Sequence, residues 1–303
     1  MSRREEADPP PPARPGGVLR VVGTPIGHLS DLSPRAVETL RASALVACED
    51  TRVTRAILER HGIAVPVVSC HRFNEHSRSE RILQVLSSGK DVALVTDSGT
   101  PGVSDPGAAV VRAARSVGFA VSPVPGPSAV AALWSVSGLE GPFTFIGFLP
   151  PRHGERKRAL AALASEPRPL VFYESPHRIL AMLEDAVEVL GDRRTLLGRE
   201  LTKIYEELNA GTLSEVRERL AGRTIRGEFT LVVEPAEGED RARGDSIESG
   251  AGDLDAAADE VARLVEEGVD RGTALKRVAR HRGVARRALY DRLVRRKRGD
   301  VDS

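Results

Sequence analysis

The sequence predicts an α/β protein with two α/β domains and a small helical C-terminal domain. Short apolar runs alternate with amphipathic stretches, and runs that are apolar throughout are typical of parallel strands covered on both faces. A break at Gly138–Pro142 separates two such series. A polar, small-residue-rich stretch then precedes segments with only helical patterning.

Each expected element is a run with the appropriate period, and most runs are bounded by Gly, Pro or polar residues. In the first series we expect, in chain order, a strand at Val18–Val22, a helix at Pro34–Arg41, a strand at Ala44–Cys48, a helix at Arg52–His61, a strand at Val65–Cys70, a helix at Glu75–Leu86, a strand at Val92–Thr96, a helix at Ala108–Val117, a strand at Ala120–Val124 and a helix at Ser128–Val136. The second series predicts strands at Thr144–Phe148, Leu170–Tyr173, Thr195–Arg199 and Phe229–Val233, with helices at Arg156–Leu163, Ile179–Leu190 and Leu213–Leu220. The last segments predict helices at Leu254–Glu267, Thr273–His281 and Ala285–Arg298.

These elements predict a domain at residues 18–138 and a second at 139–235. We expect a disordered leader at 1–17, an acidic linker at 236–252 and a basic helical domain at 253–298. The chain has no apolar run long enough to cross a membrane, and its Pro-rich, charged start is unlike a secretory signal. The two cysteines, Cys48 and Cys70, lack metal-ligand spacing and predict buried, reduced thiols. We therefore expect a cytoplasmic protein without a structural metal.

Charge is distributed unevenly along the chain. The 44 basic and 43 acidic residues give a formal net charge of +1, but Arg271 to Arg298 is densely basic, with Asp291 as its only acid. Within it, Ala274 to Leu293 has helix-turn-helix spacing. The arginines around this segment, including Arg286 and Arg287, are typical of a nucleic-acid contact surface, although a solvated charged face is the alternative.

Glycine and proline gather directly after three predicted strands. They lie at Gly23–Gly27, Asp97–Gly107 and Pro125–Ala129. The carboxyl ends of parallel strands line the ligand crevice of an open α/β sheet, so these loops predict a ligand site. They contain neither a dinucleotide fingerprint nor a phosphate-binding loop, and no Lys or Arg. A neutral or cationic small molecule with a ribose and an adenine suits them better than a polyphosphate.

Several motifs taken together resemble the tetrapyrrole-methylase superfamily. They are Gly23–Leu29, Glu49–Arg52, Asp97–Pro101, Phe172–Arg178 and Arg199–Lys203. Within the superfamily they are similar to the branch that methylates the ribose 2′-hydroxyl of a cytidine in small-subunit (16S) ribosomal RNA. The resemblance covers Leu19 to Glu234 and resumes at Thr273–Leu293. It implies a cleft between two α/β domains that binds S-adenosylmethionine, a small-subunit rRNA or small ribosomal subunit as partner, and a homodimer.

The resemblance also implies which residues bind the cofactor. By position these are Pro25, Asp97, Ser98, Gly99, Thr100, Val103, Ser128, Ala129, Tyr173 and Gly211. Members that act on tetrapyrroles usually carry Gly-Gly-Asp-Pro in the second loop, where this chain has Ser98-Gly99-Thr100-Pro101. The departure fits the RNA branch and leaves open whether Asp97 replaces the missing aspartate.

A ribose hydroxyl is weakly acidic, so a general base would help its methylation. Polar side chains at strand ends supply three candidates, Glu49, His71 and Glu75, while Arg52 and Arg178 are candidates for phosphate contacts. Two alternatives remain at this point. One is a methyltransferase for a tetrapyrrole precursor, and the other is a non-catalytic RNA-binding assembly factor on the same scaffold.

Overall fold

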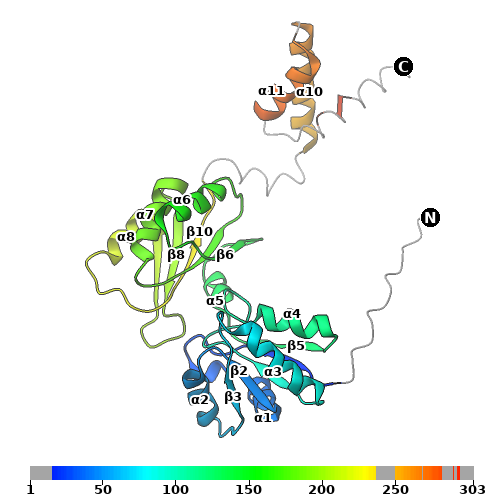
Figure 1. Cartoon of the computed structure of the whole chain (residues 1–303). Coiled ribbons are helices and arrows are strands. Elements are labelled where there is room, and N and C mark those ends of the chain that lie inside the picture. Colours follow the sequence, from blue (N-terminus) through cyan, green and yellow to red (C-terminus); the bar gives the residue numbers. More distant parts are fainter. Residues whose placement is uncertain (1–15, 237–249, 268, 282–288, 290–291, 294–303) are drawn as a thin grey trace, which may run out of the picture. The chain divides into compact units, whose positions relative to one another are not determined.

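The computed structural model describes residues 16–236, 250–267, 269–281, 289 and 292–293 (Figure 1). The chain divides into two compact units, residues 1–236 and 237–303. Within the described residues, no helix combines the length and the apolar character that a membrane crossing requires. The last predicted helix, Ala285–Arg298, lies almost entirely outside the described residues.

The first sheet of unit 1 has five parallel strands in the order β3-β2-β4-β1-β5, counted over the described chain. The strands are β1 (Leu19–Val22), β2 (Leu45–Cys48), β3 (Val67–Ser69), β4 (Val92–Leu94) and β5 (Val121–Val124). The helices that alternate with them are α1 (Pro34–Ala42), α2 (Thr51–Arg60), α3 (Glu75–Ser87), α4 (Ala108–Val117) and α5 (Ala129–Ser135), with a short 3-10 helix, η1, at Leu29–Asp31. The parallel sheet expected from the apolar runs is confirmed.

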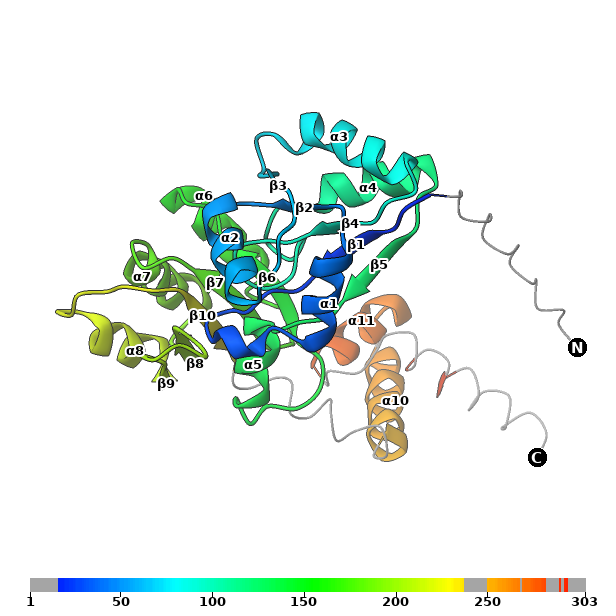
Figure 2. The same ribbon diagram turned by 90° about the horizontal axis from the view of Figure 1, so that it is seen from below.

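Both faces of this sheet are covered, as Figure 2 shows. Successive residues of β2 join different apolar clusters: Leu45 and Ala47 pack with α3 and α4, and Val46 and Cys48 pack with α1 and α2. All four residues are buried because each side of the strand meets a helix layer. This double burial explains why the strand reads as a continuous apolar run rather than an alternating one.

The second sheet is mixed, with the order β6-β7-β10-β8-β9 among the described strands. These are β6 (Thr144–Phe148), β7 (Leu170–Glu174), β8 (Arg194–Arg199), β9 (Glu207–Thr212) and β10 (Phe229–Val233). Only the β6–β7 pair is parallel. The sequence does not predict β9, because this edge strand is polar, alternates in exposure and contains no apolar run.

Helices cover the second sheet on both faces. On one face lie α6 (His153–Ala162), α7 (Ile179–Leu190) and α8 (Leu213–Leu220), which bury the largest apolar cluster of unit 1. On the other face α5 packs against β10, so a helix that follows the first sheet is shared with the second. Val130 and Leu133 of α5 join Val171, Val232 and Ile26 in one buried cluster.

Local sequence fixes where several helices begin. Ser33 precedes Pro34 at the start of α1, and its hydroxyl accepts a hydrogen bond from the Ala36 amide. Thr212 and Glu215 form a reciprocal capping box at the start of α8. Such caps satisfy amides that have no partner inside the helix.

In unit 2, α10 (Gly250–Glu266) packs against α11 (Arg271–His281). Their contact is a small apolar cluster that includes Ala258, Val261, Leu275 and Val278. The helical character expected for Leu254–Glu267 and Thr273–His281 is therefore present, with α10 starting four residues earlier than expected. The small alanines allow the two helices to approach closely.

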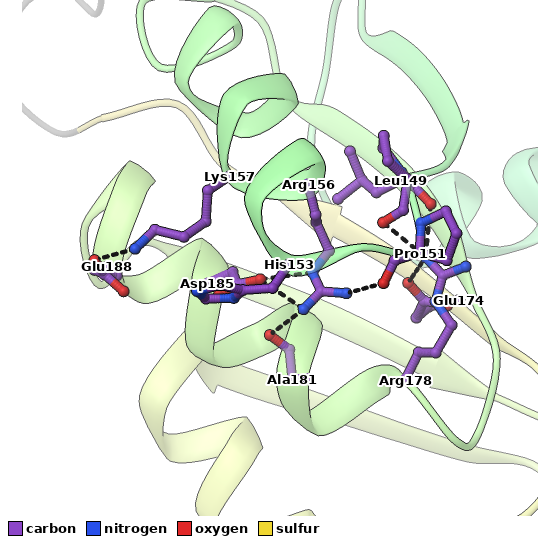
Figure 3. A network of polar contacts seen from close by, with 11 residues as sticks. Leu149, Pro151, His153, Arg156, Lys157, Glu174, Arg178, Ala181, Asp185 and Glu188 are labelled. Carbon is purple, nitrogen blue, oxygen red and sulfur yellow. Dashed lines mark hydrogen bonds and ion pairs between the residues drawn. The ribbon is translucent and has the colours of Figure 1, made fainter.

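A buried ion pair links α6 to α7 (Figure 3). The Arg156 Nε donates to Asp185 Oδ2 at 2.6 Å, while its other nitrogens donate to the carbonyls of Pro151 and Ala181. His153 Nδ1 lies 2.8 Å from the second oxygen of Asp185. Both members of the pair are almost completely buried. Arg156 therefore ties the connection that follows β6 to the helix layer behind the sheet.

We predict that Asp185→Asn destabilises unit 1 by roughly 3–5 kcal/mol, because it leaves the Arg156 guanidinium buried without a counter-charge. Chemical denaturation measures the loss. Glu188→Gln is the matched control, since it breaks the neighbouring Lys157–Glu188 pair on the surface (Figure 3). The control should cost at most about 1 kcal/mol. Equal losses in the two variants would contradict a special role for the buried pair.

Candidate active site

Three loops at the carboxyl ends of β1, β4 and β5 interlock. The Thr24 amide donates to the Gly99 carbonyl at 2.8 Å, and the Thr24 hydroxyl donates to the Thr96 carbonyl at 3.0 Å. Gly23 and Gly126 approach so closely that a Cβ on Gly126 would lie 2.8 Å from the Gly23 backbone. Glycine is required there because any side chain would collide with main chain. The predicted convergence of these loops is therefore present.

A cavity of about 530 Å³ opens beside these loops and is walled by both sheets of unit 1. From the first sheet and its loops come Ile26, Glu49, Asp97, Ser98, Gly99, Thr100, Val103, Asp105, Ser128 and Ala129. From the second come Phe148, Tyr173, Glu174, Ser175, Pro176, Glu228, Phe229 and Thr230. The volume matches that of a drug-sized or nucleoside-sized ligand.

The cavity gathers most of the residues that the family resemblance suggested for the cofactor. Those that line it are Asp97, Ser98, Gly99, Thr100, Val103, Ser128, Ala129 and Tyr173. Pro25 is buried between Thr24 and Ile26 and is not part of the wall. Gly211 lies in β9, opposite Thr195 of β8, and its α-carbon faces the side chains of Glu215 and Arg219. The structure thus places Gly211 apart from the cavity.

Of the three base candidates, only Glu49 lines the cavity. The His71 ring accepts a hydrogen bond from the Phe73 amide at Nδ1, and its Nε2 lies 3.1 Å from Asn74 Nδ2. The Glu75 carboxylate accepts a hydrogen bond from the Gly107 amide. His71 and Glu75 therefore organise the loops that border the cavity rather than its wall.

The arginine candidates for phosphate binding differ in exposure. The Arg52 side chain is 88% exposed and forms an ion pair with Asp50, and this hydrogen bond lowers the pKa of Asp50 to about 2. Arg178 faces inward, where its Nη2 donates to the Leu149 carbonyl at 2.6 Å and to Glu174 Oε2 at 3.0 Å (Figure 3). These contacts tie Arg178 to the cavity-lining Glu174, and Arg178 itself is not among the described lining residues. The other two arginine candidates, Arg286 and Arg287, lie outside the described residues.

Most residues of the second cavity wall cannot be predicted from the sequence. Phe148 and Glu174 end strands that run toward the cavity, while Glu228, Phe229 and Thr230 stand at the amino end of β10. Because β10 is antiparallel to β7, its first residues lie beside the last residues of β7. No local pattern reveals that reversal. The Phe172–Arg178 motif, which includes Tyr173, is the signal that the sequence offers on this side.

Carboxylates dominate the charge of the cavity. Five of its lining residues are acidic, and none of those described is Lys or Arg. Burial, and then the charge of Asp97, raises the pKa of Glu49, while burial raises the pKa of Asp97. Burial, reinforced by neighbouring carboxylates, raises the pKa of Asp105 to about 7. Across the described residues, no three His, Cys, Asp or Glu side chains are grouped as a metal would need. The cavity favours a cation and disfavours a polyphosphate.

An exposed aromatic ring and a cation lie together in the connection from β3 to α3. Phe73 is 94% exposed in the connection from β3 to α3, next to the exposed Arg72. The charge of Arg72 partly opposes the rise in the pKa values of Glu49 and Asp105, so its guanidinium lies within electrostatic reach of the cavity. An exposed aromatic ring beside an arginine is typical of surfaces that stack nucleobases.

Comparison with solved structures shows the fold. The methyltransferase CobJ superimposes with a TM-score of 0.57 at 21% identity, covering 73% of this chain and 95% of the other. Uroporphyrin-III-C-methyltransferase from Thermus thermophilus gives a TM-score of 0.52 at 21% identity, covering 72% and 94%. At these identities the likeness concerns architecture alone.

Sequence comparison shows the family to which the chain belongs. The profile of the family described as Tetrapyrrole (Corrin/Porphyrin) Methylases matches residues 18–217. The protein named ribosomal RNA small subunit methyltransferase I from Xylella fastidiosa is 44% identical over 278 residues, which are 90% of this chain and 98% of the relative. The protein of that name from Bacillus subtilis is 40% identical over 276 residues, 91% and 93% of the two chains. The chain therefore belongs to the tetrapyrrole (corrin/porphyrin) methylase family of methyltransferases, and within it to the group formed with these relatives.

Proposed function

We propose that this protein transfers a methyl group from S-adenosylmethionine to the ribose 2′-hydroxyl of a cytidine in small-subunit (16S) ribosomal RNA. The observation that carries the proposal is the acidic cavity between interlocked loops, in a chain about 40–44% identical to proteins named for small-subunit rRNA methylation. Because its acceptor is ribosomal RNA, we place the protein in the cytoplasm. We also propose that it works as a homodimer.

The residues of the cavity fit S-adenosylmethionine. When bound, this cosubstrate supplies an electrophilic methyl group on a positively charged sulfur. The carboxylates of Glu49, Asp97 and Asp105 would favour that charge in a half-buried site. Gly99, at φ +78°, exposes main chain where a side chain would fill the cavity. The hydroxyls of Ser98, Thr100 and Ser128 offer hydrogen-bond partners for a ribose and an amino-acid moiety.

The connection from β3 to α3 supports RNA as the acceptor. Phe73 offers a stacking face, and Arg72 offers a cation within reach of the cavity. We propose that the exposed Arg52, together with Arg286 and Arg287 of the basic segment, contacts phosphates along the strand. The choice of the cytidine 2′-oxygen rests on the family resemblance of the sequence motifs.

Two alternative functions are less well supported. A tetrapyrrole-precursor methyltransferase shares the architecture, and the solved neighbours at 18–21% identity include proteins named as such enzymes. The far greater identity to the rRNA-named proteins disfavours it. A non-catalytic RNA-binding factor would not need a cavity lined by so many of the residues that the family resemblance suggests for cofactor binding.

Mass spectrometry of small-subunit rRNA from cells with and without the protein tests the proposal. We expect one cytidine to lose a ribose methyl group in the deletion strain and to regain it on complementation. The purified protein should methylate free rRNA or assembled small subunits, and should not methylate a porphyrinoid precursor. An unchanged rRNA methylation pattern, or transfer to the porphyrinoid, would overturn the proposal.

We predict that Gly99→Val lowers the affinity for S-adenosylmethionine at least about tenfold, because the new side chain enters the cavity. Isothermal calorimetry measures the affinity. Gly62→Val is the matched control, since Gly62 also has a positive φ of +60° but nothing lies within 4 Å of its added Cβ. Both variants carry similar backbone strain. A folded Gly99→Val protein with unchanged affinity would remove this loop from the cofactor site.

We predict that Phe73→Ala weakens RNA binding by roughly 5- to 150-fold, the loss expected when one stacked base is released at about 1–3 kcal/mol. Affinity for S-adenosylmethionine should not change. Phe73→Trp keeps an aromatic face and should restore most of the RNA affinity. Filter binding at fixed salt measures the effect. If Phe73→Trp is as weak as Phe73→Ala, the ring does not act by stacking.

A further inference from the structure

We propose that the turn between β8 and β9, residues 200–206, is a second binding element for the acceptor RNA, in which Tyr205 stacks on a base close to the methylated nucleotide. The inference rests on the proposed function and adds an RNA-contacting surface on the second sheet to the one at Phe73 on the first. The turn contains most of the Arg199–Lys203 motif, which supplies none of the residues suggested so far for the cofactor, for catalysis or for RNA.

The turn presents two large apolar side chains to solvent. Ile204 is 90% exposed and Tyr205 is 73% exposed, and among the large hydrophobic residues of the described chain only Phe73 is more exposed than this pair. Single exposed apolar side chains are common, but an adjacent pair in a turn beside a cavity is a candidate contact surface.

The backbone of the turn holds these side chains in one place. Glu200 and Thr202 have φ values of +51° and +66°, which residues with a side chain seldom adopt. Strain of this kind persists where neighbouring contacts enforce it, and it is common at binding and active sites. The Thr202 amide donates to the Glu206 carboxylate at 2.6 Å, which closes the turn around Ile204 and Tyr205. A preorganised turn loses less entropy on binding than a flexible one.

The turn is also fixed to the loop that follows β1. The Thr202 hydroxyl accepts a hydrogen bond from the His28 amide at 3.1 Å. A Cβ on Gly27 would lie 2.7 Å from that hydroxyl oxygen and would collide with Lys203 Cγ, so the two segments are in close contact. Ile26, the residue before Gly27, lines the cavity. The turn therefore reaches from the second sheet to a loop of the first, beside the cavity.

Lys203 places the turn at the mouth of the cavity. Its Nζ donates to Glu200 Oε1 at 2.8 Å and to Glu228 Oε2 at 3.1 Å. Glu228 lines the cavity although its side chain is 70% exposed, so it marks a place where the cavity opens to solvent. Tyr205, two residues beyond Lys203, therefore lies close to this opening.

A macromolecular acceptor has to cover the mouth of the cavity. A ribose hydroxyl can enter only if the nucleotides before and after it pass over the opening, because the cavity has room for little more than one nucleoside. On the side of the first sheet, Arg72 lies within electrostatic reach of the cavity-lining Glu49, and Phe73 follows it in the chain. Tyr205 provides an aromatic face on the side of the second sheet. Aromatic side chains that each stack a base are the usual means of binding single strands.

The charged groups beside the turn favour RNA over a second copy of this chain. Arg226 is exposed in the connection from α8 to β10, and its carbonyl accepts a hydrogen bond from Arg199 Nε at 2.7 Å, next to the turn. The neighbouring acid Glu207 is paired with Arg199 at 2.8 Å. An aromatic ring beside an arginine suits stacked bases joined by phosphates. A stable protein interface buries about 800 Å² on each partner, of which Ile204 and Tyr205 would supply only a part.

RNA binding by full-length variants tests the proposal. Tyr205→Ala should weaken binding to small-subunit rRNA by roughly 5- to 150-fold, the loss expected when one stacked base is released. Tyr205→Phe keeps the ring and should retain most of the affinity. Leu208→Ala is the matched control, since Leu208 is an exposed apolar residue of β9, beyond the turn, and this variant should bind as the wild type does. Filter binding at fixed salt measures the affinities.

The salt dependence of binding separates stacking from phosphate contacts. Tyr205→Ala should leave the slope of log affinity against log salt unchanged, because stacking releases no counterions. Arg226→Gln should reduce that slope by about 0.7, the change expected for one phosphate contact on a single strand. A changed slope in Tyr205→Ala would contradict the stacking role.

Wild-type RNA affinity in Tyr205→Ala, or an equal loss in Tyr205→Phe, would overturn the inference while leaving the proposed function intact. The same holds if Tyr205→Ala turns a dimer into a monomer in sedimentation, because the turn would then be a contact between two copies of the chain. A wild-type protein that neither binds nor methylates small-subunit rRNA would instead overturn the proposed function and this inference with it.

Discussion

The apolar cluster that joins α5, Ile26 and the second sheet is the constraint on which the active site depends. Val130 and Leu133 of α5 are buried against Val171 and Val232, although α5 follows the first sheet in the chain. Burial of these side chains is worth about 1.5–3 kcal/mol each. Because the helix is shared, the strand ends of one sheet face the strand ends of the other. Neither sheet alone could form the cavity.

The electrostatics of the cavity follow from this arrangement. Carboxylates brought together in a half-buried space repel one another and lose contact with water. The free energy of unfolding therefore falls as these carboxylates ionise. The raised pKa of Asp105 makes the sign explicit, since stability associated with the protonated acid is lost as the pH rises from about 4 through about 7. The same lack of compensation makes the site attractive to a cation. In the proposed enzyme, the positive charge of the ligand balances the carboxylates, because none of the described residues that line the cavity is Lys or Arg.

Much of this could be predicted from the sequence, where local pattern and structure coincide. Apolar runs identified all the strands of the first sheet, and Gly and Pro placement identified the loops that meet at its edge. The polar strand β9 was missed because an edge strand needs no apolar signature. Glu228 and Thr230 were missed because only the antiparallel pairing of β10 with β7 brings them to the cavity. His71 and Glu75 also follow strands, yet their side chains contact Asn74 and the Gly107 amide, since a position after a strand does not decide which neighbour a side chain binds.

The measurement that tests the central claim most directly is the ratio of affinities for S-adenosylmethionine and its neutral product, S-adenosylhomocysteine, as the pH is raised from 5.5 to 8.5. The two ligands differ by one methyl group and one positive charge. If half-buried carboxylates select the cation, the ratio should rise in favour of S-adenosylmethionine by roughly tenfold as Asp105 ionises. A ratio that stays constant across this range would contradict the account, because the charge of the cavity would then play no part in recognising its ligand.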